Sequence, residues 1–172
     1  MTRLIAAILL LWPLQLSAQE AEPPMTIERM TAIVKAIDPA AELGGSGFTL
    51  TIDDVPVVII ADLTANRMRA MVPIRSADGM TFDEMQRLMQ ANFDSALDAR
   101  YAIAQGRVWG VFLHPFRELE RDQLISGIAQ TVNVAKSYGT LYSSGAGQFG
   151  GGDSGRLQRE LIEELLDRGQ DI

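Results

Sequence analysis

The chain of 172 residues contains no cysteine and a single histidine. The absence of cysteine excludes a disulfide, a thiolate nucleophile and any metal site with a thiolate ligand. One histidine alone would need several carboxylates to hold zinc, and no group of acids in the sequence has that spacing. We therefore expect no metal and no cofactor, and a fold that is held together by its hydrophobic core alone.

Basic residues are fewer than acidic residues in this chain. The 15 Lys and Arg residues face 22 Asp and Glu residues, which gives a net charge of −7. Loss of residues 1–18, whose one charged residue is Arg3, would make it −8. A net negative chain repels phosphate backbones and anionic lipid surfaces. This composition argues against nucleic-acid or membrane-surface binding as the main role.

The one long apolar run lies at the N-terminus and is short for a membrane span. Residues 4–11 are apolar, Arg3 precedes them, and Pro13 interrupts the run before Ala18 offers a cleavage site. Spanning a bilayer takes roughly 20 apolar residues. A cleaved signal peptide at residues 1–18 is thus favoured over a retained anchor. We expect a periplasmic or secreted protein of the Gram-negative bacterial type, with no membrane span after cleavage.

The rest of the chain is long enough for one domain with two short appendages. Proline-ended residues 19–24 predict a disordered leader, and six glycines in residues 145–155 predict a flexible linker. The predicted organisation is a signal peptide (1–18), a leader (19–24), an α+β domain (25–142), a Gly-rich linker (143–153) and a C-terminal amphipathic helix (154–172).

Helical periodicity and caps locate the helices. A first helix is predicted between Thr26, which can cap its start, and Pro39, which ends it. Thr81 and Glu84 form a capping-box pattern that opens a second helix. The longest helix is predicted for residues 118–138, and a last amphipathic one for residues 154–168. The second helix carries an apolar stripe that is predicted to be buried: Phe82, Met85, Leu88, Met89 and Phe93.

Strand patterns form two groups. Residues 48–52, 55–61 and 68–74 predict a three-stranded meander, and residues 99–104 and 107–113 predict a hairpin. Strands grouped in this way, with helices between the groups, predict an α+β fold and not a parallel sheet. The predicted fold is an antiparallel five-stranded sheet with helices, in the order α-β-β-β-α-β-β-α, plus a tethered C-terminal helix.

This order of elements resembles the YbjN-like family, whose fold matches the chaperones of type III secretion. The sequences DDVPVVII at 53–60, RYAIAQGRVWGVF at 100–112 and PFREL at 115–119 are similar to the family's two hairpins and the start of its long helix. The resemblance covers roughly residues 25–140 and has no invariant chemical motif. It implies a non-enzymatic domain, and a regulator of sensory transduction in some descriptions of the family.

Candidate catalytic features each have a simpler interpretation. Residues 145–150 spell G-x-G-x-x-G, but they follow a long helix and not a strand, so a linker is favoured over a dinucleotide site. His114 lies between Leu113 and Pro115 with no partner motif, which favours a strand-end residue over a general base. Ser46 lacks the wider nucleophile motif. We therefore expect no catalytic residue and no enzymatic activity.

Two predicted strands are apolar on both faces, namely residues 55–61 and 107–113. Such strands are typical of a sheet with both faces covered. The second face could be covered by the C-terminal helix, by a partner subunit or by a ligand, and we favour the helix or a homodimer. The candidate interaction surface comprises Trp109, Val111, Leu113, Val58 and Ile60.

These features predict a periplasmic binding or chaperone-like module that recognises a protein partner or a second copy of the chain. The alternative is a structural component of an envelope assembly that presents helix 154–168 as a docking element.

Overall fold

The computed structural model describes residues 22–45, 47–94, 96–139 and 153–170. The predicted signal peptide, residues 19–21 of the predicted leader, Ser46, the G-x-G-x-x-G segment and all of the predicted linker except residue 153 lie outside these residues. The described elements run in the order α-β-β-β-β-α-β-β-α-α. The predicted α+β class and antiparallel sheet are confirmed, but the predicted five strands are wrong because a sixth strand is present.

The sheet has the strand order β1-β2-β3-β4-β6-β5, and all neighbouring strands are antiparallel. The strands are β1 (Glu42–Gly44), β2 (Gly47–Ile52), β3 (Val55–Asp62), β4 (Arg67–Ser76), β5 (Arg100–Ala104) and β6 (Arg107–Pro115). The predicted hairpin turns are confirmed. Asp53, Asp54, Gln105 and Gly106 all have positive φ, as two-residue hairpin turns require.

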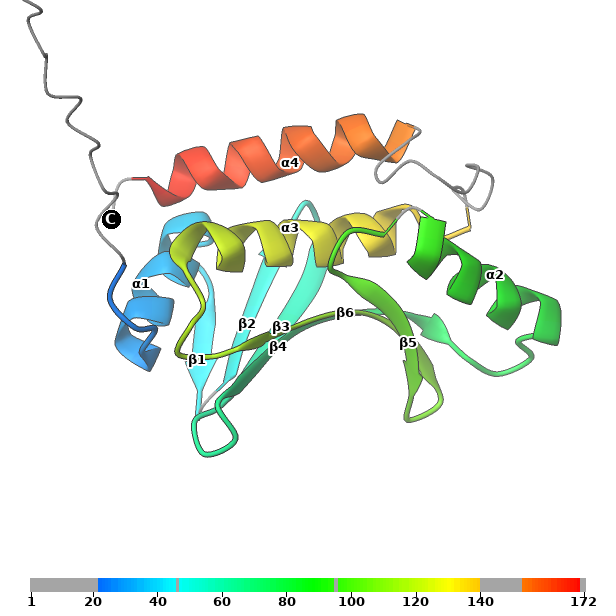
Figure 1. The fold of residues 1–172 in the computed structure, drawn as a ribbon, viewed down its shortest axis with the longest axis horizontal. Helices are drawn as coiled ribbons and strands as arrows, with labels where there is room; N and C mark the ends of the chain where they lie inside the picture. The colour runs from blue at the N-terminus through cyan, green and yellow to red at the C-terminus, as the bar shows by residue number, and fades with distance from the viewer. Residues whose placement is uncertain (1–21, 46, 95, 140–152, 171–172) are drawn as a thin grey trace, which may run out of the picture.

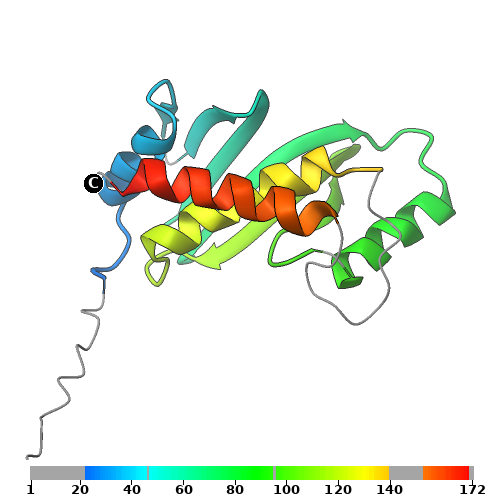
Figure 2. The same cartoon turned by 90° about the horizontal axis from the view of Figure 1, so that it is seen from above.

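The helices are α1 (Ile27–Ile37), α2 (Phe82–Asp94), α3 (Arg121–Lys136) and α4 (Asp153–Gly169). As Figure 1 shows, α3 lies along one face of the sheet, α1 lies at the β1–β2 end, and α4 runs over α3. Figure 2 shows α4 beside α3 from above, with α2 at the far end of the molecule. Among the described helices, none has the length and apolar content to cross a membrane.

The core lies between the sheet and the helices. Alternate residues of each long strand point to it, such as Ile59 in β3, Ala70 in β4 and Phe112 in β6. Leu124, Ile125 and Ile128 of α3 meet them from above; α4 then covers the helical layer with two buried leucines, Leu161 and Leu165. The hydrophobic core therefore has three layers, which are sheet, α3 and α4.

The position of α4 corrects one expectation. The C-terminal helix folds back, but it packs on α3 and α1 and not on the second face of the sheet. No described element covers that second face at residues 55–61 and 107–113, so its predicted coverage by the C-terminal helix is wrong, while coverage by a partner subunit or a ligand stays a prediction. In β3, for example, Val57 and Ile59 are buried, whereas Ile60 is 46% exposed.

The predicted burial of the α2 stripe is also wrong. Of its five residues only Leu88 is buried, while Phe82 and Phe93 are each 72% exposed, Met89 53% and Met85 37%. The helix extends beyond the end of the sheet and contacts β5, as Figure 1 shows. Of these five side chains only Leu88 joins the hydrophobic core, and the other four are left exposed.

Candidate interaction surface

The candidate surface is the sheet face opposite the helices, which we call the outer sheet face. Its residues are aligned by the strand register. One row crosses all six strands and a second crosses five: Glu42–Thr49–Val58–Met71–Val111–Arg100 and Gly44–Gly47–Ile60–Arg69–Leu113. Because residues directly opposite on neighbouring strands have Cβ atoms roughly 5 Å apart, the first row is a continuous line of side chains. The second row is such a line only from Ile60 to Leu113, because Gly44 and Gly47 have no side chain.

All five residues of the sequence-predicted surface lie on the outer sheet face. Ile60 and Leu113 are 46% and 53% exposed, while Val58, Val111 and Trp109 are half-buried. The Trp109 indole N–H donates to the Ala104 carbonyl at 3.0 Å, which fixes the indole on this face. The structure thus brings the five side chains together on one open face; whether they bind a partner stays a prediction.

A hollow of about 410 Å³ lies on the outer sheet face near the β3–β4 turn. Its apolar lining includes Ile60 and Leu113, and its polar lining includes Asp62, Arg67 and Arg69. One carboxylate oxygen of Asp62 accepts the Ala65 N–H at 2.8 Å. The hollow therefore combines an apolar floor with two guanidinium groups at its rim.

The β3–β4 turn beside this hollow is held by Asn66. Its backbone carbonyl accepts the Phe116 N–H at 3.2 Å, and its side-chain oxygen accepts the Arg117 N–H at 2.9 Å. Its amide donates to Glu118 at 2.8 Å, and this hydrogen bond is the main reason why the pKa of Glu118 is lowered. Asn66 thereby ties the turn to the segment after β6 and orients Arg67 beside the sheet.

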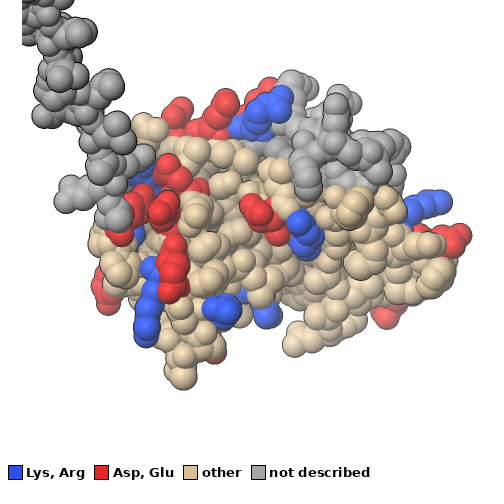
Figure 3. All heavy atoms as spheres, in the orientation of Figure 1, with Lys and Arg blue, Asp and Glu red and all other residues tan. Residues whose placement is uncertain are grey.

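The basic residues of the outer sheet face are not among the five residues that the sequence predicted for this surface. Arg67, Arg69, Arg100 and Arg107 all fall on this face by register. For two of them the signal was present in the alternation of residues 67–74, where Arg67 and Arg69 flank the buried Met68. Figure 3 shows basic side chains along the lower rim of the molecule, on the side of the sheet away from the helices.

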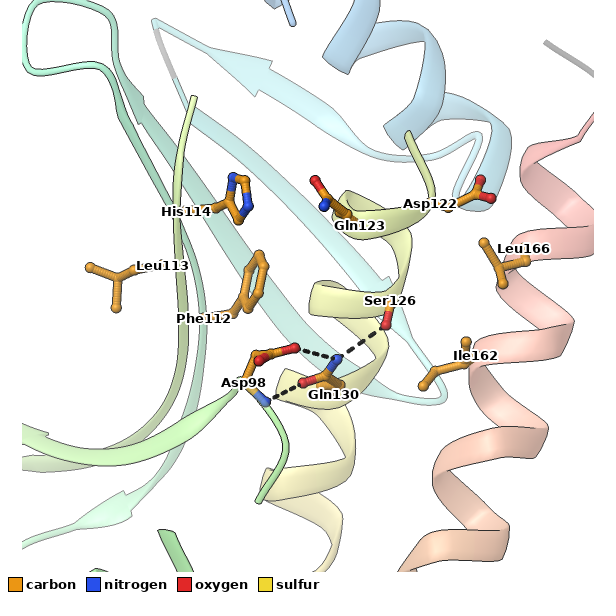
Figure 4. A pocket seen from close by; sticks show the side chains of 10 residues that line it. All are labelled: Asp98, Phe112, Leu113, His114, Asp122, Gln123, Ser126, Gln130, Ile162 and Leu166. Atoms are coloured by element: carbon orange, nitrogen blue, oxygen red, sulfur yellow. Dashed lines mark hydrogen bonds between the residues drawn. The ribbon is translucent and has the colours of Figure 1, made fainter. Parts of the chain in front are cut away.

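A second hollow, of about 530 Å³, lies at the edge of β6 under α3 and α4 (Figure 4). Strand β5 begins at Arg100, opposite Val111, so the last residues of β6 have a strand neighbour only on β4. In Figure 4, Phe112 and His114 point toward α3, whereas Leu113 points away to the outer sheet face. Leu113 contributes to the lining of both hollows.

The polar groups of this second hollow serve the fold. The buried Gln130 oxygen accepts the N–H groups of Asp98 and Ala99 at 2.8 and 3.2 Å, and the Gln130 amide donates to Ser126 at 3.1 Å. These bonds hold the chain where it enters β5. His114 Nδ1 lies 2.8 Å from the Pro115 carbonyl oxygen, and its ring stacks on Phe112. Within the described residues, His114 has no hydrogen bond to a serine or a carboxylate.

The described part of the chain contains no candidate metal site. No three His, Asp or Glu side chains there come together in a way that could hold an ion.

The comparisons with known proteins concern the fold. No family model and no curated protein matches the sequence. Among solved structures, a chain in the crystal structure of the ExsC–ExsE complex is similar, with a TM-score of 0.53 and 13% identity over 71% of this chain and 99% of that one. A chain in the HopA1–SchA chaperone–effector complex has a TM-score of 0.49 and 8% identity over 63% and 91%. The first likeness shows a shared fold, while the chaperone-like role and YbjN-like membership stay predictions.

Proposed function

We propose that this protein is a non-enzymatic, chaperone-like module that binds a segment of a protein partner on its outer sheet face. The observation that carries the proposal is the open face itself, with Ile60 and Leu113 about half exposed beside a hollow of about 410 Å³. Exposed apolar side chains that line a common hollow are typical of binding grooves in soluble proteins. The shared fold with a chain of a protein–protein complex, ExsC–ExsE, supports this function.

The absence of catalysis is part of the proposal. A histidine that acts as a general base is oriented by one partner and reaches a nucleophile. The His114 ring nitrogen that makes a hydrogen bond contacts a backbone carbonyl, and the ring stacks on Phe112. Both contacts suit a strand-end residue. The hydrogen bonds among Gln130, Asp98 and Ser126 likewise have a structural role, because they hold the chain where it enters β5.

We also propose an exported location and a regulatory role. The location rests on the signal-peptide pattern of residues 1–18, and the regulatory role on the resemblance to the YbjN-like family. The alternative, a docking role for the C-terminal helix, has less support. Leu161 and Leu165 of α4 are buried against the rest of the fold, so α4 would have to leave α3 before a partner could bind its apolar side.

Self-association has its own candidate surface. Phe82, Met85, Met89 and Phe93, which we call the α2 stripe, are exposed along one face of α2. When exposed aromatic and methionine side chains at helical spacing pack against an equivalent helix, their apolar surface is removed from water, which is favourable. We therefore assign the homodimer to the α2 stripe, which leaves the outer sheet face for a protein partner.

Site-specific photocrosslinking in the native cells tests the proposed function. A benzophenone side chain would replace Leu113 on the outer sheet face or, as a control, the exposed Glu163 on α4. We expect a discrete adduct with another protein from position 113 only, and its loss when Ile60→Asp is added. Adducts that are the same from both positions would refute binding at this face. An adduct with the mass of two chains would instead make the face a homodimer interface.

A further inference from the structure

The outer sheet face is basic in an acidic protein. Besides its apolar residues it carries Arg67, Arg69, Arg100 and Arg107, against the two acids Glu42 and Asp62. The whole chain has a net charge of −7. These four arginines therefore lie on the one sheet face that the described elements leave open.

Within the described residues, none of these arginines forms an ion pair with an acid, although the charge of Arg67 contributes a little to the lowered pKa of Glu118. The ion pairs found among the described residues lie elsewhere: Arg29–Glu22, Arg75–Glu84, Arg121–Asp122, Lys136–Asp53 and Arg168–Glu164. The guanidinium groups of Arg67 and Arg100 donate only to nearby backbone carbonyls, those of Asn66, Leu97 and Ala99. Arg69 makes no ion pair or hydrogen bond with its side chain in the described part of the structure. Its charge is available to a partner.

The position of Arg69 links the charge to the apolar hollow. In the row across the strands, Arg69 lies directly between Ile60 of β3 and Leu113 of β6. Arg67, two residues before Arg69 in the chain, lies on the same face of β4 and lines the same hollow. An apolar side chain that enters the hollow therefore places its neighbours within reach of two guanidinium groups.

We infer that the outer sheet face takes an acidic segment of a partner protein, in which an apolar side chain is flanked by Asp or Glu. This inference rests on the proposed function and adds its chemistry. Carboxylates pair with guanidinium groups in a two-pronged, charge-assisted geometry. A neutral or basic segment would bury Arg69 without a counter-charge, which is costly. Charge complementarity therefore selects the segment, and the apolar hollow anchors it.

An anionic membrane is the competing occupant of a basic and apolar face. The net charge of the chain opposes it, because an acidic protein is repelled from an anionic surface. The acidic α4, with Glu160, Glu163, Glu164 and Asp167, adds to that repulsion on the opposite side of the molecule. A single segment that meets only the outer sheet face avoids this repulsion.

Fluorescence anisotropy with labelled peptides tests the inference on the full-length chain. Three peptides of equal length would alternate leucine with glutamate, with serine or with lysine. We expect saturable binding of the glutamate peptide, weakened about tenfold or more by Arg69→Glu and weakened further by salt. Arg159→Glu, which changes the charge of an exposed α4 residue equally, should leave the affinity unchanged.

The Leu113→Asp variant separates failure of the inference from failure of the proposed function. If all three peptides bind equally, and Leu113→Asp but not Arg69→Glu abolishes binding, the face binds segments without selecting acids, and the inference is wrong. Peptide binding that is unchanged by Leu113→Asp must occur at another site, and it would overturn both the inference and the proposed function. Failure of the glutamate peptide to bind overturns the inference alone, because crosslinking decides the function. Binding to phosphatidylcholine–phosphatidylglycerol vesicles that Arg69→Glu abolishes would assign the face to a membrane.

Discussion

At the scale of single residues, the packing between sheet and helix depends on small side chains. Gly110 lies on the inner face of β6, and a Cβ atom there would lie 3.0 Å from the Thr131 carbonyl oxygen and 3.3 Å from a Val134 methyl. The first contact is to the backbone of α3, which cannot rotate away. Gly110 therefore sets how closely α3 approaches the sheet. Nothing in the alternation of residues 107–113 indicates this role, because it depends on which helix crosses the strand.

Gly110→Ala should lower the free energy of unfolding by about 1–3 kcal/mol, the usual cost of overpacking a core. Urea unfolding followed by circular dichroism would measure the change. Gly44→Ala is the matched control, because a Cβ atom at Gly44 meets nothing within 4 Å. If both variants are equally stable, α3 does not approach β6 as closely as the structure has it.

At the scale of elements, local sequence signals correctly predicted where two helices begin, but they were a poor guide to which side chains are buried. Thr26 and the Thr81–Glu84 capping box both make the predicted hydrogen bonds, because a cap needs only residues a few positions apart. Strand β1 was missed because its three residues are all exposed and two of them are not apolar. The α2 stripe was predicted as core because periodicity shows which side chains share a face, but not what lies opposite.

The start of α2 should respond to pH through Glu84. Its pKa is lowered chiefly by the Thr81 N–H, which donates to the carboxylate at 2.7 Å, and then by the Thr81 hydroxyl. Because the pKa is lower in the folded protein than in the unfolded chain, this stabilisation is present above the ordinary value of 4.5 and is lost as pH falls through the lowered pKa. The wild type should thus exceed Glu84→Gln in stability at neutral pH.

Urea titrations between about pH 7 and pH 3 would measure that difference. The advantage of the wild type over Glu84→Gln should shrink toward zero at the acidic end. Glu163→Gln on α4 makes the same change of charge at an exposed position and serves as the control. A difference between wild type and Glu84→Gln that does not vary with pH would contradict the role of the carboxylate.

At the scale of the whole molecule, two apolar surfaces remain uncovered by the described elements. The outer sheet face is the side of the sheet away from α3, and α2, whose stripe is exposed, lies beyond the end of the sheet (Figure 1). The strand pattern of the sequence correctly indicated which residues share the outer face. It could not indicate that α4 would cover α3 instead, since the partner of a tethered amphipathic helix is decided by the shape of the remaining surface.

The α2 stripe should hold two copies together. We expect size-exclusion chromatography with light scattering to give a dimer for the wild type and a monomer for Met89→Glu/Phe93→Glu, because each glutamate would place a charge in the apolar contact. Leu113→Glu alters an equally exposed residue of the outer sheet face and should leave the dimer intact. A monomeric wild type, or a dimer that only Leu113→Glu dissociates, would refute this assignment.

The place of Trp109 has a practical consequence. The chain has two tryptophans, Trp12 and Trp109, and the first lies within the predicted signal peptide. Removal of the predicted signal peptide would leave the indole on the outer sheet face as the only one in the protein. Its emission reports the polarity around it, so a segment that covers this face would shift the spectrum toward the blue. The protein thus carries an intrinsic fluorophore on the surface where we expect its partner.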